Sequence, residues 1–287
     1  MAKRAEPPPM PSNGKNSAYM RLIEAIFLER YQPGMVRIEF ARSDITKAAS
    51  ELKIALPKNL GDLIYTFRYR RELPQAVLKR CPSGKVWIIR PTGAAKYAFE
   101  LTKPALSNIQ PNPSLVQVKV PNATPGIIEM YALSDEQALL AKLRYNRLID
   151  IFTGLTCYQL QSHLRTTVPK IGQVETDDLY VGLDRRGCQY VIPVQAKAGR
   201  DRLSVIQIEQ DFRLCAVKFP DLICLPVAAQ FLHSDTIALF SFAHGNGSLQ
   251  DEVAVASERH YHLVEPGELS PQELRAYCTR EPTGGAV

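Results

Sequence analysis

Residues 172–199 read GQVETDDLYVGLDRRGCQYVIPVQAKAG and carry most of the information in the chain about its architecture. Two apolar runs flank the polar turn Asp184–Gly187, and this pattern predicts a β-hairpin. The first strand carries Asp177, and the second carries Gln195 and Lys197. Side chains at i and i+2 of a strand leave the same face, so Gln195 and Lys197 are expected to point together.

The oxygen-bearing side chains of this hairpin predict a site for a divalent metal. Mg²⁺ takes oxygen ligands and is usually held by one or two carboxylates together with a substrate phosphate. Asp177 supplies a charge, the Gln195 carbonyl supplies a neutral oxygen, and Glu175 shares a strand face with Asp177. The ammonium of Lys197 is suited to orient an attacking water, to help remove its proton and to stabilise charge on a phosphate oxygen. We therefore expect phosphodiester hydrolysis with Mg²⁺, for which Mn²⁺ can substitute.

The order Asp, hairpin, Gln-x-Lys resembles the PD-(D/E)xK nuclease superfamily, which has the restriction-endonuclease-like fold. The motif VQAK at 194–197 is similar to the Gln-x-Lys variant of Mrr-type restriction nucleases, in which Gln replaces the usual acidic residue. The resemblance covers roughly residues 135–245 and implies an α/β fold whose mixed central sheet is flanked by helices. It also implies a catalytic set: Asp177 and Gln195 as metal ligands, Lys197 as catalytic lysine and Glu175 in support.

The same residues have a simpler interpretation, which the sequence leaves open. Asp177 and Asp178 also fit solvated carboxylates at a strand edge, and Lys197 also fits a surface lysine in a glycine-bounded turn. The assisting metal ligand is open as well. Three carboxylates are candidates for it: Glu175, Asp178 and Asp150.

Length and composition indicate a chain with two folded domains. The 287 residues are 45% hydrophobic and 22% charged, which is ordinary usage for a globular protein. No apolar run approaches the roughly 20 residues that span a bilayer, and residues 1–9 lack an apolar signal core. We therefore expect a cytoplasmic protein that does not bind membranes. The six cysteines show no CxxC spacing and are expected to be reduced thiols.

Charge is divided unevenly along the chain. Residues 1–101 hold 18 Lys and Arg against 9 Asp and Glu (+9), whereas residues 102–287 hold 17 against 20 (−3), which together give the net charge of +6. A basic domain joined to a mildly acidic one fits DNA that is held by one part and cut by the other. A solvated basic surface is the alternative.

The N-terminal part resembles a winged helix-turn-helix domain in layout. Its expected elements are a helix at 17–30, a strand at 36–40, helices at 44–52 and 60–71, and a hairpin formed by 86–90 and 97–101. In such a domain the third helix enters the major groove and the wing touches the backbone. The residues expected to contact DNA are Arg68, Arg71 and Tyr65 of the third helix and Lys85 and Lys96 of the wing. Alternatively, Tyr65 is a core residue and the domain serves dimerisation.

The remaining segments complete the expected domain plan. The plan is a disordered tail at 1–16, the winged-helix domain at 17–101, a Pro-rich linker at 102–126 and the nuclease domain at 127–287. The sequence SDEQ at 134–137 predicts a capping box at the start of a helix that reaches residue 152, and a further helix is expected at 157–165. A second capping box at 204–207 starts a helix to Lys218. Arg200 and Arg202, just before that helix, are expected to clamp phosphates, with a solvated helix start as the alternative.

Together these features predict a Mg²⁺-dependent restriction-type endonuclease that cuts double-stranded DNA, for instance in host defence. A homodimer is expected, because cutting both strands of a duplex needs two sites. Two other functions fit the same residues. One is a non-catalytic winged-helix regulator, which the Gln at position 195 favours, and the other is a structure-specific nuclease for repair or recombination.

Overall fold

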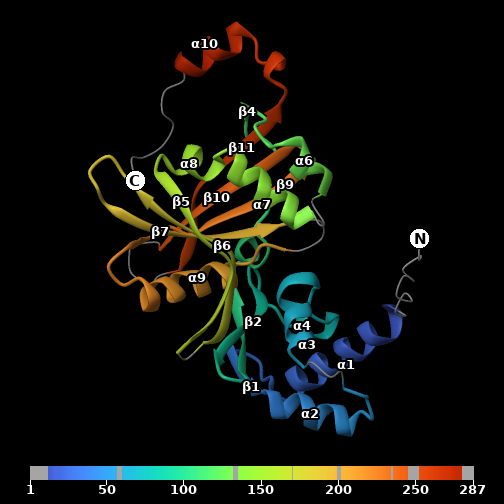
Figure 1. Cartoon of the computed structure of the whole chain (residues 1–287). Helices are drawn as coiled ribbons and strands as arrows, with labels where there is room; N and C mark the ends of the chain where they lie inside the picture. Colours follow the sequence, from blue (N-terminus) through green and yellow to red (C-terminus); the bar gives the residue numbers. More distant parts are fainter. Residues whose placement is uncertain are drawn as a thin grey trace, which may run out of the picture. The chain divides into compact units, whose positions relative to one another are not determined.

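The computed structural model describes residues 12–56, 60–131, 135–169, 171–198, 202–233, 235–244 and 252–279. The chain forms two compact units, Met1–Pro104 and Ala105–Val287 (Figure 1). Both units combine helices with strands, so the protein is a mixed α/β chain.

The first unit contains a three-stranded antiparallel sheet of order β1-β3-β2 among its described residues, with helices packed against it. Phe27 lies at the centre of its core, because its ring meets Trp87 and Phe99 edge to face at centroid distances of 5.3 and 5.1 Å. The elements are α1 (Ser12–Arg30), β1 (Arg37–Ala41), α2 (Arg42–Glu51), α3 (Gly61–Tyr65), the π-helix η1 (Thr66–Arg70), α4 (Gln75–Leu78), β2 (Val86–Gly93) and β3 (Lys96–Thr102).

The predicted helices and hairpin of this unit are present with different bounds. Helix α1 begins at Ser12, within the segment expected as a tail, and residues 1–11 lie outside the described residues. The expected third helix is α3 continued by the π-turn η1, which ends where the Arg71 amide donates to the Thr66 carbonyl at 2.8 Å. Turns of this kind are rare and frequently occur at functional sites.

The second unit contains a mixed sheet that, within the described residues, has eight strands in the order β4-β11-β10-β9-β7-β6-β5, with β8 paired to β7. β4 with β11, β7 with β8 and β7 with β9 are parallel pairs, and the other pairs are antiparallel. The strands are β4 (Gln117–Pro121), β5 (Thr156–Val168), β6 (Gly172–Leu183), β7 (Gln189–Lys197), β8 (Ile223–Cys224), β9 (Val227–His233), β10 (Thr236–His244) and β11 (Val253–Val264). The helices are α5 (Pro104–Ser107), α6 (Gly126–Tyr131), α7 (Asp135–Tyr145), α8 (Leu148–Thr153), α9 (Val205–Lys218), the 3₁₀ turn η2 (Pro266–Glu268) and α10 (Pro271–Thr279).

Helices cover both faces of this sheet, as Figure 1 shows for α7 and α9. Strand β7 alternates between two cores: Ile192 packs in the cluster that contains Leu139 of α7, and Val191 packs in the cluster that contains Leu214 of α9. The expected mixed sheet flanked by helices is therefore confirmed. The predicted hairpin is also present, with the turn closed by the Gly187 amide on the Asp184 carbonyl at 3.0 Å.

Two of the helix predictions for the second unit are wrong. The helix expected at 157–165 is the central part of β5, because the segment pairs along its length with β6. The helix expected to run to residue 152 is interrupted between α7 and α8, where Arg147 adopts a left-handed backbone with φ of 52°. Pairing with a neighbouring strand outweighed local helical spacing in the first case.

The helices also bear on the membrane expectation. In the ranges that the structure describes, no helix is both long enough and apolar enough to cross a bilayer. The longest of the described helices is α1, whose 19 residues include Arg21 and Glu24.

Candidate metal centre

The β6–β7 hairpin opens at the point where its acidic residue lies. The regular pairing of the two strands runs from Leu183 opposite Gln189 to Asp178 opposite Val194. Beyond it, the Asp177 side chain accepts the Ala196 amide at 2.8 Å through Oδ2. A carboxylate therefore takes the place of a backbone carbonyl at the end of the ladder, and this fixes the direction of the Asp177 side chain.

Lys197 completes a buried ion pair with this carboxylate. Its Nζ lies 3.2 Å from Asp177 Oδ2, and the side chains of Lys197 and Asp177 are only 8% and 12% exposed. Burying two charges costs desolvation energy, and apolar residues of similar volume often stabilise a protein equally well or better. A contribution to folding stability is therefore a weak explanation for this buried pair, and a role in the chemistry of the site is the better one.

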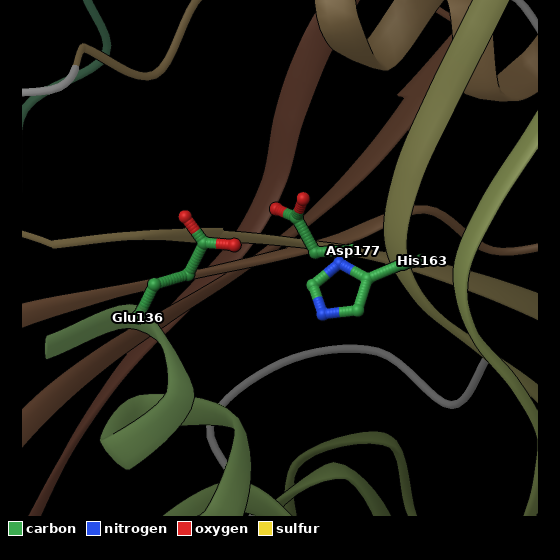
Figure 2. A group of neighbouring side chains, drawn as sticks. All are labelled: Glu136, His163 and Asp177. Carbon is green, nitrogen blue, oxygen red and sulfur yellow. The ribbon is translucent and has the colours of Figure 1, made fainter. Parts of the chain in front are cut away.

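Two further side chains meet Asp177 and form a possible metal-binding cluster. Glu136 at the start of α7, His163 of β5 and Asp177 of β6 each offer one ligand atom, and these atoms lie within 4.8 Å of one another. Figure 2 shows Glu136 and His163 on either side of Asp177. We refer to these three residues as the Glu-His-Asp cluster.

The donor atoms of the Glu-His-Asp cluster fit a divalent cation. Carboxylate oxygens and imidazole nitrogens bind such ions at about 2.0–2.6 Å, so two ligands of one ion lie no more than about 5 Å apart. The spacing of up to 4.8 Å meets this requirement. The hydrogen bonds from the Ala196 amide and from Lys197 Nζ both end on Oδ2 of Asp177, and Oδ1 is the oxygen that these two bonds do not use.

Gln195 has other partners. Its Nε2 donates to Asp211 of α9 at 3.0 Å and to the Glu175 carbonyl at 3.2 Å, and its Oε1 accepts Nε2 of Gln207 at 3.2 Å. The structure thus brings Asp177 and Lys197 together, and it places the Gln195 amide in a buried network with helix α9. Gln207, expected to complete a capping box, points its amide at Gln195 instead.

Asp211 is the acidic member of that network. It is fully buried, and burial raises the pKa of its carboxyl well above the usual range, against the hydrogen bond from Gln195. The charge of Asp177 raises this pKa further, whereas Lys197 lowers it. A carboxyl group therefore lies next to position 195, where the Gln-x-Lys motif lacks one.

The three carboxylates that were candidates for assisting a metal have structural partners. Glu175 is 45% exposed and pairs with Arg165 at 2.7 Å. Asp178 is fully buried and accepts Nη2 of Arg144 at 3.1 Å from α7, with further donors on Gln159, Ser162 and Tyr180. Asp150 accepts the Cys157 amide at 2.8 Å and joins α8 to β5.

The residues of the third predicted helix that were expected to contact DNA differ in their exposure. Arg68 faces inward: its Nε donates to the Ile89 carbonyl at 3.0 Å, and its guanidinium lies 5.9 Å from the Tyr97 ring centroid. Tyr65 is 40% exposed, and Arg71 is also exposed. Arg70, which the sequence did not single out, lies 4.9 Å from the Tyr65 ring centroid.

The remaining basic candidates lie on the hairpin of the first unit and before α9. Lys85 and Lys96 are exposed near the ends of β2 and β3. Arg202 is half-buried beside the start of α9, and Arg200 lies outside the described residues. The exposed lysines are therefore available to a phosphate backbone.

Sequence reasoning missed Glu136, His163 and Asp211. Glu136 lies inside the predicted capping box, so a helix start explained it without any ligand role. His163 lies in the segment expected to be helical, so its position beside Asp177 of β6 could not be predicted. For Asp211 the available signal was weak, because it is one of two acidic residues, with Glu209, in the predicted helix that ends at Lys218.

No family model, curated protein or solved structure matches this chain. The kind of site is therefore defined by its own side chains. It is an Asp–Lys pair on adjacent strands, beside a cluster of two carboxylates and an imidazole suited to a divalent cation.

Proposed function

We propose that the protein is a metal-dependent DNA endonuclease of the restriction type. The second unit is its restriction-endonuclease-like, PD-(D/E)xK core, and the first unit is its winged-helix DNA-binding domain. The observation that carries the proposal is the 3.2 Å contact between Lys197 Nζ of β7 and Asp177 Oδ2 of β6. Asp177 also belongs to the Glu-His-Asp cluster.

The order of elements supports the assignment of the core. A helix, the hairpin β6–β7 that holds the motif, the helix α9 and further strands follow one another, as the resemblance implies. Strand β5, expected as a helix, lies beside β6 and adds His163 to the site. The side chains needed for the reaction thus come from consecutive elements of one sheet and its covering helix.

Each side chain has a role in hydrolysis. Asp177, Glu136 and His163 would hold the divalent cation, which would supply a Lewis acid for a phosphate oxygen when bound. Lys197 is held beside Asp177, where its ammonium stabilises the charge that develops on the phosphate and orients the attacking water. Asp177 in turn is oriented by the Ala196 amide.

The proposed reaction is a simple hydrolysis. The oxygen of a water molecule forms a bond to phosphorus, and the bond between phosphorus and one ester oxygen breaks. The water releases a proton to solvent, and the leaving ester oxygen takes up a proton. Neither an oxidant nor a further co-substrate is required, so the chain needs to supply only ligands, orientation and positive charge.

Double-stranded DNA is the proposed substrate because of the charge and exposure of the first unit. Residues 1–101 hold 18 Lys and Arg against 9 Asp and Glu, and Arg71, Lys85 and Lys96 are exposed. Basic side chains on one domain contribute most of the affinity for a phosphate backbone. A homodimer would supply the two sites required to cut both strands.

The test is cleavage of supercoiled plasmid with Mg²⁺ or Mn²⁺ by the full chain and by Lys197→Ala. We expect the variant to be slower by about 100-fold or more, since removal of one charge-stabilising donor costs about this much. Lys218→Ala, at the exposed end of α9, is the matched control and should cut like the wild type. Equal cleavage by the wild type and Lys197→Ala would refute the proposal.

A non-catalytic DNA-binding regulator is the second candidate. The observation in its favour is that both ends of the Gln195 amide are bonded to α9 or to backbone, so the amide is part of the packing of the unit. A regulator would bind duplex DNA equally well with and without chelator and would leave it intact with every metal. Cleavage that depends on added metal excludes this candidate.

A further inference from the structure

We infer that the Glu-His-Asp cluster selects a transition-metal cation of the first row, such as Mn²⁺, Co²⁺ or Zn²⁺, over Mg²⁺, and that His163 is the selecting residue. The inference deepens the proposed function, on which it rests for its biological use. The selection itself is a property of the side chains and does not depend on DNA cleavage.

The first step concerns the position of His163 on the sheet. The β5–β6 register pairs Ser162 with Asp178 and Leu164 with Thr176, so His163 lies opposite Asp177. Opposed residues of neighbouring antiparallel strands have their Cβ atoms about 4.5–5.5 Å apart. Figure 2 shows the imidazole beside the Asp177 carboxylate, with Glu136 on the other side.

The backbone of His163 is the second step. Its φ is 49°, in the left-handed region that residues other than glycine seldom adopt. The strand also shifts its register between Gln159 and Gln161, a few residues before this point. Such conformations carry an energetic cost and cluster at functional sites, where they help to aim a side chain. The side chain carried by this left-handed residue of β5 is the imidazole of His163, so the backbone conformation helps to set the direction of the imidazole.

The chemistry of the donor atoms is the third step. Mg²⁺ demands near-ideal octahedral oxygen coordination and gives up its waters reluctantly. Imidazole nitrogen suits Zn²⁺, Fe²⁺, Ni²⁺ and Cu²⁺, and the affinity of a given nitrogen and oxygen site rises from Mn²⁺ through Co²⁺. One nitrogen among the cluster's donor atoms therefore favours the transition-metal ions. With oxygen in place of the imidazole, the site would be an all-oxygen site suited to Mg²⁺.

The test compares metal affinities of the full chain by isothermal titration with MgCl₂, MnCl₂ and CoCl₂. For the wild type we expect affinity to rise in the order Mg²⁺, Mn²⁺, Co²⁺. The informative variant is His163→Asn, because Asn tolerates a left-handed backbone and replaces the nitrogen donor by a carbonyl oxygen. We expect this variant to lose about 10-fold or more of the Co²⁺ to Mg²⁺ affinity ratio, mainly through weaker Co²⁺ binding.

A matched control and a second readout keep the test decisive. His233→Asn changes an exposed histidine of β9 and should leave the ratio unchanged. Bound Co²⁺ should also shift the proton resonances of one imidazole strongly in wild type, and this signal should be lost in His163→Asn. An unchanged affinity ratio together with a retained imidazole signal in that variant would overturn the inference.

The outcome is separable from that of the proposed function. A chain that binds Co²⁺ through His163 but cuts no DNA would remove the nuclease assignment and leave the metal selection in place. The opposite outcome would keep the nuclease assignment and remove the metal selection. In that case the wild type and His163→Asn would bind Mg²⁺ and Co²⁺ with equal affinity and would cut DNA equally well with either ion.

Discussion

Lys197 Nζ and Asp177 Oδ2 lie 3.2 Å apart in a site where both side chains are almost completely buried. The two residues come from neighbouring strands, 20 positions apart in sequence, and the same carboxylate oxygen also accepts the Ala196 amide. Each charge is therefore compensated in part by the other. This compensation makes the pair testable by stability as well as by activity.

Removing one member of the pair should destabilise the protein more than removing both charges. Lys197→Met leaves Asp177 buried without its cation, and breaking a buried pair in this way costs about 3–5 kcal/mol. The double variant Lys197→Met with Asp177→Asn should recover a large part of that loss, because no uncompensated charge is left. Urea denaturation of the single and double variants measures this coupling. Equal stabilities for the two would show that the pair is effectively solvated.

The network around Asp211 predicts a different pattern. Asp211→Ala leaves the Gln195 amide without its buried acceptor, so we expect a loss of about 1–3 kcal/mol in the free energy of unfolding. Asp211→Asn keeps an acceptor and removes a carboxyl that burial disfavours in its charged form, so it should be less damaging than Ala. Chemical denaturation at neutral pH compares the two variants. A larger loss for Asn than for Ala would contradict this account of the network.

Acid should weaken the contact that holds α10 to β4. Lys119 pairs with Glu273 at 2.7 Å, and this hydrogen bond, together with those from Ser270, lowers the pKa of Glu273 from 4.5 to about 2. A carboxyl whose pKa is lower in the folded state contributes stability that is fully present above its unfolded pKa, near 4.5, and is lost as the pH falls toward 2. Glu273→Gln should therefore show a shallower fall in thermal stability between pH 5 and 2. The slopes would be identical if the pair did not form in solution.

Arg68 and Arg71 should behave differently although they are close in sequence. Arg68→Ala removes the hydrogen bond to the Ile89 carbonyl and should cost about 1 kcal/mol of stability. Arg71→Ala changes an exposed side chain, so stability should stay within about 0.5 kcal/mol while the salt dependence of DNA binding loses about one unit of slope. Thermal melts and fluorescence anisotropy at several salt concentrations measure both effects. If Arg71→Ala bound DNA with the same affinity and salt dependence as the wild type, Arg71 would not contact a DNA phosphate.

The hairpin could be predicted from sequence because its signals are local. The polar turn at Asp184–Gly187 and the apolar run on each side of it are patterns of neighbouring residues. The mixed sheet flanked by helices was expected from the resemblance carried by the Asp and Gln-x-Lys residues, and the structure has such a sheet. Contacts between hairpin residues were thus within reach of sequence reasoning.

Strand β5 shows why the site could be predicted only in part. Cys157, Leu160 and Leu164 fall at helical spacing, and no Pro or Gly interrupts them. Pairing with β6 decides the conformation of this segment, and the paired residues lie between 10 positions (Arg165 and Glu175) and 25 positions (Cys157 and Gly182) apart in sequence. Because the segment was assigned to a helix, His163 had no predictable position next to Asp177. Glu136 had the right secondary structure but no signal for what its side chain would meet.

The parallel pairing of β4 with β11 joins residues near 119 to residues near 262. The three strands of the first unit are all available once Thr102 has been synthesised. On the ribosome, the first unit can therefore fold early, whereas β4 can pair with its neighbour β11 only after translation has passed Val264. During that interval strands β5, β6 and β7 have already been synthesised, whereas the opposite edge of the sheet is completed only near the end of synthesis.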